Sequence, residues 1–186
     1  MRIGEKPLIA AAAVQQRVAE LAEAVSRDYA CKHAYGDGAE HPRGVGIVLV
    51  TVLKGGLPFA ADLMRRLTIP VTLEFVRARS YKGVRSRGAV EFTHLPETSL
   101  AGKDVLLVED ILDTGVTAAA ILDRLDAERP ASLHLCTLLD KPARRQVDVR
   151  PRYVGFQIDN HFVVGYGLDY NEAYRELPDV YILHQD

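Results

Sequence analysis

Residues 105–120 read VLLVEDILDTGVTAAA, an apolar run followed by an acidic turn and then by small and hydroxyl residues. The run Val105–Val108 is typical of a strand that is buried on both faces, as in a parallel sheet, and a helix is expected from about Val116. A loop between such a strand and a helix lies at the carboxyl edge of the sheet, where α/β folds bind their ligands. We therefore expect a functional site in the loop Glu109–Thr117.

The loop Glu109–Thr117 has two chemically different halves. Its first acids, Glu109 and Asp110, suit sugar hydroxyls and Mg²⁺, whose ligands are oxygens. Its second half opens a helix, with Thr114 as the expected cap and Gly115 permitting close backbone approach, and a helix N-terminus binds anions. The loop has no lysine and no GxxxxGK[ST] pattern, which argues against a P-loop nucleoside triphosphatase. It therefore suits one ligand that carries both a phosphate and a diol.

The rest of the chain alternates expected strands with expected helices. Strands are predicted at residues 45–53, 71–76, 105–108, 133–139, 153–158 and 180–183, and helices at 9–30, 58–66 and 116–128. This alternation predicts an α/β fold with a mainly parallel twisted sheet flanked by helices. Residues 31–44 and the polar, aperiodic stretch 77–96 are predicted loops, and the second is long enough to be functional. The length of 186 residues fits a single domain, residues 1–186.

Composition argues against several classes of protein. The formal net charge is -2, so no global basic field favours nucleic acid. The apolar run Leu8–Val14 is short for a signal peptide, and no run approaches the roughly 20 apolar residues of a membrane span. The two cysteines, Cys31 and Cys136, provide no disulfide framework, as expected in a reduced compartment. We expect a cytoplasmic protein with no membrane and no nucleic-acid partner.

The segment VLLVEDILDTGVT resembles the 5-phosphoribosyl-1-diphosphate (PRPP) signature of type I phosphoribosyltransferases. The resemblance implies the type I phosphoribosyltransferase fold, with a small purine-binding hood at about 153–186 and a flexible lid at about 77–96. It implies that Glu109 and Asp110 hold the ribose hydroxyls of PRPP, with Mg²⁺ nearby. It also implies that the 5-phosphate is bound by the backbone and hydroxyl groups of Asp113, Thr114, Gly115, Val116 and Thr117.

Two later segments resemble the 6-oxopurine members of that family, the hypoxanthine-guanine phosphoribosyltransferases. They read TLLDKPARR, residues 137–145, and FQIDNHFVVGYGLDYNEAYRELP, residues 156–178. The resemblance implies that Lys141 donates to the purine O6, that Phe162 stacks on the purine and that Val163 reads ring position 2 through its backbone. In the same hood, Asp169 is expected to hold a second Mg²⁺ at the diphosphate, and Arg175 to reach the diphosphate oxygens.

The segment LKGG, residues 53–56, resembles the diphosphate loop of the same family. The resemblance implies that Lys54 and Gly55 contact the diphosphate and that the peptide bond between them is cis.

The segment RARSYKG, residues 77–83, resembles the start of the lid. Ser80 and Tyr81 are the recurring pair of that lid, and Arg77 is expected at a subunit contact of a homodimer or homotetramer. The stretch KGVRSRGAVEF departs from the family here, because Arg85 and Arg87 replace the usual hydroxyl residues.

The implied reaction joins PRPP to hypoxanthine and/or guanine and yields IMP or GMP plus diphosphate, with Asp113 as the base that accepts the purine N7 proton. Two alternatives stay open: a regulator of the same fold that binds nucleic acid, and a phosphoribosyltransferase for another base, such as xanthine, adenine or orotate. A regulator needs a basic face, whereas the arginine pairs Arg65–Arg66 and Arg144–Arg145 are expected to be solvated. The histidines never fall at HExxH spacing, which argues against a zinc enzyme of that kind.

Overall fold

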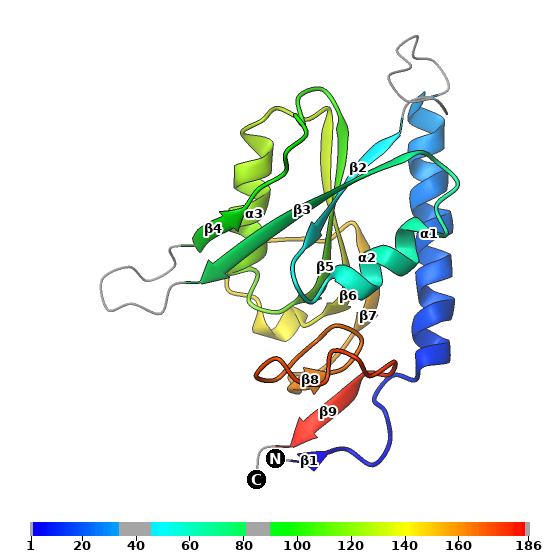
Figure 1. The fold of residues 1–186 in the computed structure, drawn as a ribbon, viewed down its shortest axis with the longest axis vertical. Helices are drawn as coiled ribbons and strands as arrows, with labels where there is room; N and C mark the ends of the chain where they lie inside the picture. Colours follow the sequence, from blue (N-terminus) through cyan, green and yellow to red (C-terminus); the bar gives the residue numbers. More distant parts are fainter. Residues whose placement is uncertain (1, 34–45, 81–89, 185–186) are drawn as a thin grey trace.

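The computed structural model describes residues 2–33, 46–80 and 90–184 of the chain (Figure 1). Its elements, in chain order, are β1 (Arg2–Ile3), α1 (Ala11–His33), β2 (Ile47–Val52), α2 (Leu57–Met64), β3 (Val71–Ser80), β4 (Val90–His94), β5 (Asp104–Leu112), α3 (Val116–Asp126), β6 (Ser132–Asp140), the short 3-10 helix Pro142–Arg144, β7 (Tyr153–Gln157), β8 (Val163–Val164) and β9 (Tyr181–His184). None of the helices in these ranges is long and apolar enough to cross a membrane.

Six of the strands form one sheet in the order β4-β3-β2-β5-β6-β7. All its neighbours pair in parallel except β3 and β4, which confirms the predicted mainly parallel α/β fold. The strands β1, β9 and β8 form a second, antiparallel sheet. Figure 1 shows this small sheet below the carboxyl ends of the parallel strands, with both chain termini close to it. This small sheet therefore faces the edge of the large sheet where the candidate site residues lie (Figure 1). The predicted hood began too early, because Tyr153–Gln157 form β7 and belong to the large sheet.

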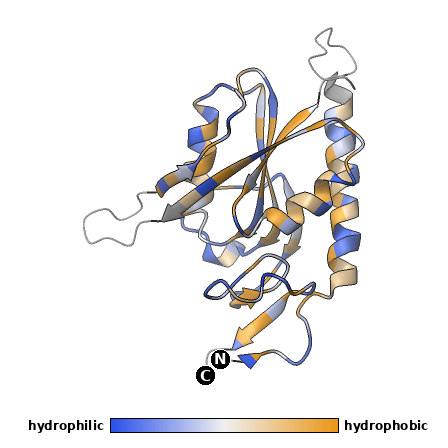
Figure 2. Cartoon of the chain, in the orientation of Figure 1, coloured by the Kyte–Doolittle hydropathy of each residue, from blue (hydrophilic) through white to orange (hydrophobic). Residues whose placement is uncertain are grey.

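The large sheet is covered on both faces because successive side chains of a strand point to opposite sides. In β2, Ile47 and Leu49 pack with residues of α1 and α2, whereas Val48 and Val50 pack with residues of α3. Figure 2 shows the corresponding concentration of hydrophobic residues on the central strands. This two-sided burial explains why β2 reads as an uninterrupted apolar run in the sequence.

The prediction of a long loop at 77–96 was wrong for most of the residues in this range that the structure describes. Strand β3 continues through Ser80, and β4 returns beside it in an antiparallel pair with an irregularity between Arg77 and Ala78. The alternating burial of β4 belongs to a strand at the edge of the sheet, whose polar face is compatible with solvent. Tyr81 and the rest of the predicted lid through Ala89 lie outside the described residues.

Other predictions also needed correction. Strand β5 runs through Leu112, so the first residues of the predicted loop Glu109–Thr117 belong to the strand. Helix α1 extends through His33 and so enters the stretch 31–44 that was predicted to be a loop. The strands β1 and β8 were not predicted, because two residues are too few to show an alternating pattern.

Candidate active site

Four segments meet at the carboxyl edge of the large sheet. They are the turn after β2, the stretch Glu109–Thr117 that ends β5 and leads into α3, the segment that follows β6, and the stretch 158–180. Figure 1 shows the last of these passing across the strand ends. Parallel strands bring their carboxyl ends to one edge, so residues far apart in sequence gather there.

Glu109 and Asp110 are adjacent acids within β5, of which Glu109 is buried and Asp110 is partly buried. The Glu109 side chain is 7% exposed, and its Oε2 has no hydrogen-bond partner among the described residues. Burial, with a smaller contribution from the Asp110 carboxylate, raises the pKa of Glu109 to about 8. Burial also raises the pKa of Asp110 to about 6. A cation or hydroxyl donors at this position would therefore satisfy an unpaired buried acid.

The turn after β2 packs directly on Asp110. A β-carbon at Gly55 would lie 1.7 Å from Oδ2 of Asp110, and one at Gly167 would lie 2.2 Å from the carbonyl oxygen of Gly55. Gly167, with its positive φ and a backbone neighbour, therefore admits only glycine, whereas a side chain at Gly55 would displace the Asp110 carboxylate. The cis peptide bond joins Leu53 and Lys54, one residue earlier than the predicted Lys54–Gly55 bond.

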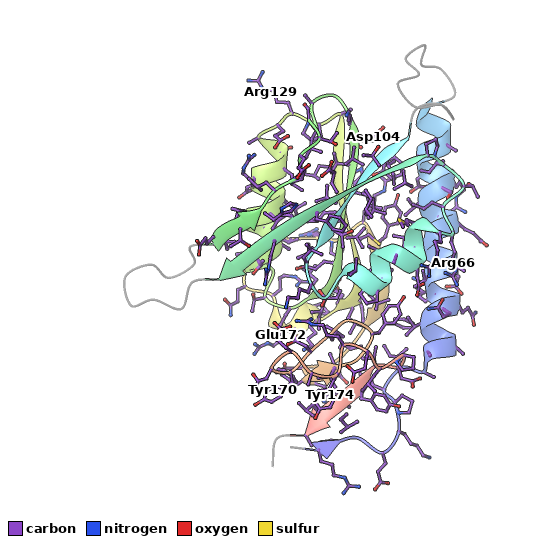
Figure 3. The ribbon with its side chains drawn as sticks, in the orientation of Figure 1. Arg66, Asp104, Arg129, Tyr170, Glu172 and Tyr174 are labelled. Atoms are coloured by element: carbon purple, nitrogen blue, oxygen red, sulfur yellow. The ribbon has the colours of Figure 1, made fainter. Side chains whose placement is uncertain are left out.

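Two of the predicted diphosphate ligands lie together beside this turn. Nζ of Lys54 lies 2.9 Å from Oε2 of Glu172, and Nη2 of Arg175 lies 3.4 Å from the same oxygen. Arg175 also pairs with Oδ1 of Asp169 at 2.8 Å and donates through Nη1 to the carbonyl of Gly167 at 2.7 Å. Figure 3 places Glu172 on the segment below the strand ends. The structure thus groups Asp169 with the cations rather than with the stacking residue Phe162.

The second half of the loop Glu109–Thr117 leads into α3. Gly115, with φ of 83°, is the residue that caps the helix, so the prediction that Thr114 caps it was one residue early. Oγ1 of Thr114 instead accepts a hydrogen bond from the Val116 N–H at 3.4 Å. Val116 and Thr117 form the first turn of the helix, which presents N–H groups to the site.

Asp113 lies between the two halves of the loop and is half-buried. Its Oδ1 accepts a hydrogen bond from Nε of Arg144 at 3.0 Å. Arg144 follows β6, so this ion pair links the loop of β5 to that of the neighbouring strand. Arg144 is exposed, as expected, although it also makes this ion pair. Arg145 was expected to be solvated as well, but its side chain is only 15% exposed, so that expectation was wrong.

Lys141 and Phe162 form a further part of the site, on the hood side. Lys141 is 6% exposed, and its Nζ donates to the carbonyl of His161 at 2.6 Å. Burial lowers the pKa of Lys141. The neighbouring Phe162 ring is 43% exposed and meets Tyr170 edge-on at 5.8 Å. The side chain of Val163 is buried, and its strand β8 pairs with β9.

Known proteins resemble this chain in both sequence and structure. The family model described as the phosphoribosyl transferase domain matches residues 9–171. The chain belongs to the phosphoribosyltransferase family.

Individual relatives are similar over most of their length. The hypoxanthine-guanine phosphoribosyltransferase of Mycobacterium tuberculosis is 41% identical over 171 residues, covering 91% of this chain and 81% of that protein. The hypoxanthine phosphoribosyltransferase of Salmonella typhimurium is 41% identical over 174 residues, covering 93% and 92%. A solved structure of the hypoxanthine phosphoribosyltransferase of Trypanosoma cruzi superposes with a TM-score of 0.89 at 38% identity, covering 99% of this chain and 93% of that one.

Two residues of this phosphoribosyltransferase to which the sequence assigned no role in the site also contribute to it. Glu172 is the carboxylate shared by Lys54 and Arg175, and Arg145 pairs with the buried Asp140. For Arg145 a signal was present, because an acid that ends an apolar strand needs a cation nearby. For Glu172 none was present, since its partner Lys54 lies 118 positions away. Of the predicted lid pair, Ser80 ends β3 and Tyr81 lies outside the described residues.

Proposed function

We propose that this chain transfers the 5-phosphoribosyl group of PRPP to hypoxanthine and/or guanine, forming IMP or GMP and diphosphate. The observation that carries the proposal is an acidic pair, one member buried and one partly buried, between a helix N-terminus and a pair of cations. PRPP has the matching order of groups: a phosphate, a diol and a diphosphate. The 6-oxopurine acceptor is supported by the relatives, which are named for hypoxanthine or for hypoxanthine and guanine.

The three parts of PRPP correspond to three groups of residues in this proposal. The ribose hydroxyls donate to Glu109 and Asp110. The diphosphate lies on the backbone of Gly55 and between Lys54 and Arg175, whose guanidinium fork suits phosphate oxygens. The 5-phosphate is held at the start of α3 by backbone and hydroxyl donors of Asp113, Thr114, Gly115, Val116 and Thr117.

The residues at the acidic pair fit Mg²⁺, the cofactor that the family resemblance implies. Magnesium is usually held by one or two carboxylates together with substrate oxygens rather than by an all-protein cage. The unpartnered oxygen of Glu109 beside Asp110 matches that requirement, and Asp169 supplies a further carboxylate on the diphosphate side. When bound, Mg²⁺ would neutralise charge on the leaving diphosphate.

The purine is proposed to lie between Phe162 and Lys141. Lys141 has three N–H donors, of which one bonds to the hood carbonyl, so the others can donate to the purine O6. Phe162 offers an exposed ring face for stacking. The backbone of Val163 is assigned to ring position 2.

The reaction exchanges one bond at C1 of the ribose for another. The bond from C1 to the diphosphate oxygen breaks, the bond from C1 to purine N9 forms, and Asp113 takes the proton from N7. Lys54 and Arg175 stabilise the charge that develops on the diphosphate. Closure of the lid that carries Ser80 and Tyr81 excludes water, which would otherwise hydrolyse PRPP.

The decisive experiment measures diphosphate release from PRPP with hypoxanthine, guanine, xanthine and adenine in turn, with Mg²⁺ and with a chelator. We expect turnover with the 6-oxopurines that requires Mg²⁺, and little with adenine. Turnover with adenine alone would show that adenine, and not a 6-oxopurine, is the acceptor. Salt-sensitive nucleic-acid binding without turnover would show that the protein is a nucleic-acid-binding regulator instead. Light scattering checks the expected homodimer or homotetramer.

A further inference from the structure

The segment after β6 is joined to the loop Glu109–Thr117 by a series of hydrogen bonds. The N–H of Lys141 donates to the carbonyl of Leu112 at 3.0 Å, and the N–H of Gln146 donates to the carbonyl of Thr114 at 2.9 Å. Nη1 of Arg145 donates to the carbonyls of Leu112 at 3.1 Å and Asp113 at 2.6 Å. Three successive carbonyls, 112 to 114, thus all accept hydrogen bonds from the segment after β6.

This arrangement fixes the direction of the N–H groups in the same peptides. In a trans peptide the C=O of one residue and the N–H of the next point in opposite directions. Since the carbonyls of Leu112, Asp113 and Thr114 face the segment after β6, the N–H groups of Asp113, Thr114 and Gly115 face away from it. Successive N–H groups on one side of a turn make a concave anion site.

Arg145 is itself held in place from the β6 side. Its Nη2 pairs with Oδ1 of Asp140, and the two side chains are 15% and 6% exposed. Asp140 ends β6 directly beside Leu112 in the sheet register. The stem of Arg145 lies beneath the turn, because a β-carbon at Gly115 would be 3.0 Å from its Cδ. The guanidinium of Arg145 thus connects the buried carboxylate of Asp140 to two loop carbonyls. A lysine ammonium at this position could not make all of these contacts, because it lacks the planar fork of a guanidinium.

We propose that Arg145 is a positioning residue for the 5-phosphate of the substrate. It holds the carbonyls of Leu112 and Asp113 so that the following N–H groups converge on the phosphate. This inference rests on the proposed function, which places the 5-phosphate at this loop. It gives Arg145 a role distinct from that of Lys141, although both belong to the segment that resembles the purine-contacting segment of the family.

The test compares IMP with inosine, which differ only in the 5-phosphate, by calorimetric binding to wild type and to Arg145→Lys. The variant keeps a positive charge beside Asp140 but loses the fork. We expect the affinity advantage of IMP over inosine to fall by about tenfold or more, the effect of about one charge-assisted hydrogen bond. Binding of inosine and of diphosphate should change little. Arg150→Lys is the matched control, because Arg150 is exposed and pairs only with Asp148 among the described residues.

Each outcome separates the inference from the proposed function. A wild-type protein that binds inosine as tightly as IMP would refute the 5-phosphate assignment itself. If the wild type binds IMP more tightly than inosine and Arg145→Lys does so to the same extent, the positioning role of Arg145 is overturned but the 5-phosphate assignment stands. An equal loss of IMP, inosine and diphosphate binding would show general damage and also overturn it. Asp140→Asn supplies a second variant, in which Arg145 keeps its hydrogen bonds to the loop carbonyls but loses its ion pair with Asp140. We expect the affinity for IMP relative to inosine to fall in this variant too, but by less than in Arg145→Lys.

Discussion

Replacing Glu109 by glutamine should make the stability of the protein less dependent on pH. Burial raises the pKa of Glu109 from its ordinary 4.5 to about 8. Between these values the folded protein holds a proton on this carboxyl that the unfolded chain releases. The wild-type free energy of unfolding therefore falls as pH rises through this window, and the loss is complete above the folded-state pKa.

The size of the effect follows from the two pKa values. At about 1.4 kcal/mol per pKa unit, the rise corresponds to at most about 5 kcal/mol for Glu109. Part of it arises only once Asp110 is ionised, above its own pKa of about 6. A neutral glutamine of the same shape carries no such cost. We expect Glu109→Gln to be more stable than wild type by about 2 kcal/mol or more above pH 8, and nearly equal to it near pH 4.5.

Urea unfolding of the ligand-free protein across this pH range measures the difference. Glu176→Gln is the control, because Glu176 is an exposed acid and should follow the wild-type curve. If the difference between Glu109→Gln and wild type is the same at every pH, burial of an acid at this position is not its cause, and the reasoning fails.

Three further variants test other groups of the site. Asp113→Asn should lower turnover by about 10²- to 10⁴-fold while PRPP still binds, and unchanged turnover would reject Asp113 as the base. Lys141→Ala should weaken discrimination of 6-oxo from 6-amino purines by about tenfold, and equal discrimination would remove Lys141 from base recognition. Glu172→Gln should strengthen diphosphate binding a few-fold at low salt, because Lys54 and Arg175 no longer share a competing carboxylate. An affinity that is unchanged at every salt concentration would show that Glu172 does not compete.

The large sheet was predictable because its strands are buried on both faces, which leaves continuous apolar runs such as that of β2. The first part of β3 was predicted, at 71–76, but its last residues and β4 were not. An edge strand such as β4, with an exposed face, has a polar, weakly periodic sequence like that of a loop. The two-residue strands β1 and β8 form because β9 lies beside them, so their structure depends on distant pairing. Local pattern therefore predicted the core of the fold better than its hood.

The place of the site was predictable for the same reason, because the carboxyl ends of parallel strands share one edge. The ion pairs within it were not. Asp113 with Arg144, Lys54 with Glu172 and Arg145 with Asp140 each join residues whose proximity depends on the tertiary fold or on a turn. The sequence pattern indicates which charged residues lie in the site, whereas the tertiary fold determines which of them form ion pairs with one another.

The contacts of Arg145 bear on how acceptor choice and PRPP binding are related in this chain. Read as sequence, the acidic loop and the segment after β6 are separate motifs, one for PRPP and one for the purine. In the structure, the carbonyls of Leu112, Asp113 and Thr114 are bonded to that second segment, and Arg145 is anchored on Asp140 beside Lys141. A change of base specificity that replaced the whole segment would therefore disturb the phosphate site as well. Changes confined to the side chains of Lys141 and Phe162 should alter the acceptor while leaving PRPP affinity intact, because they leave in place both the carbonyl contacts of Arg145 and the cations Lys54 and Arg175.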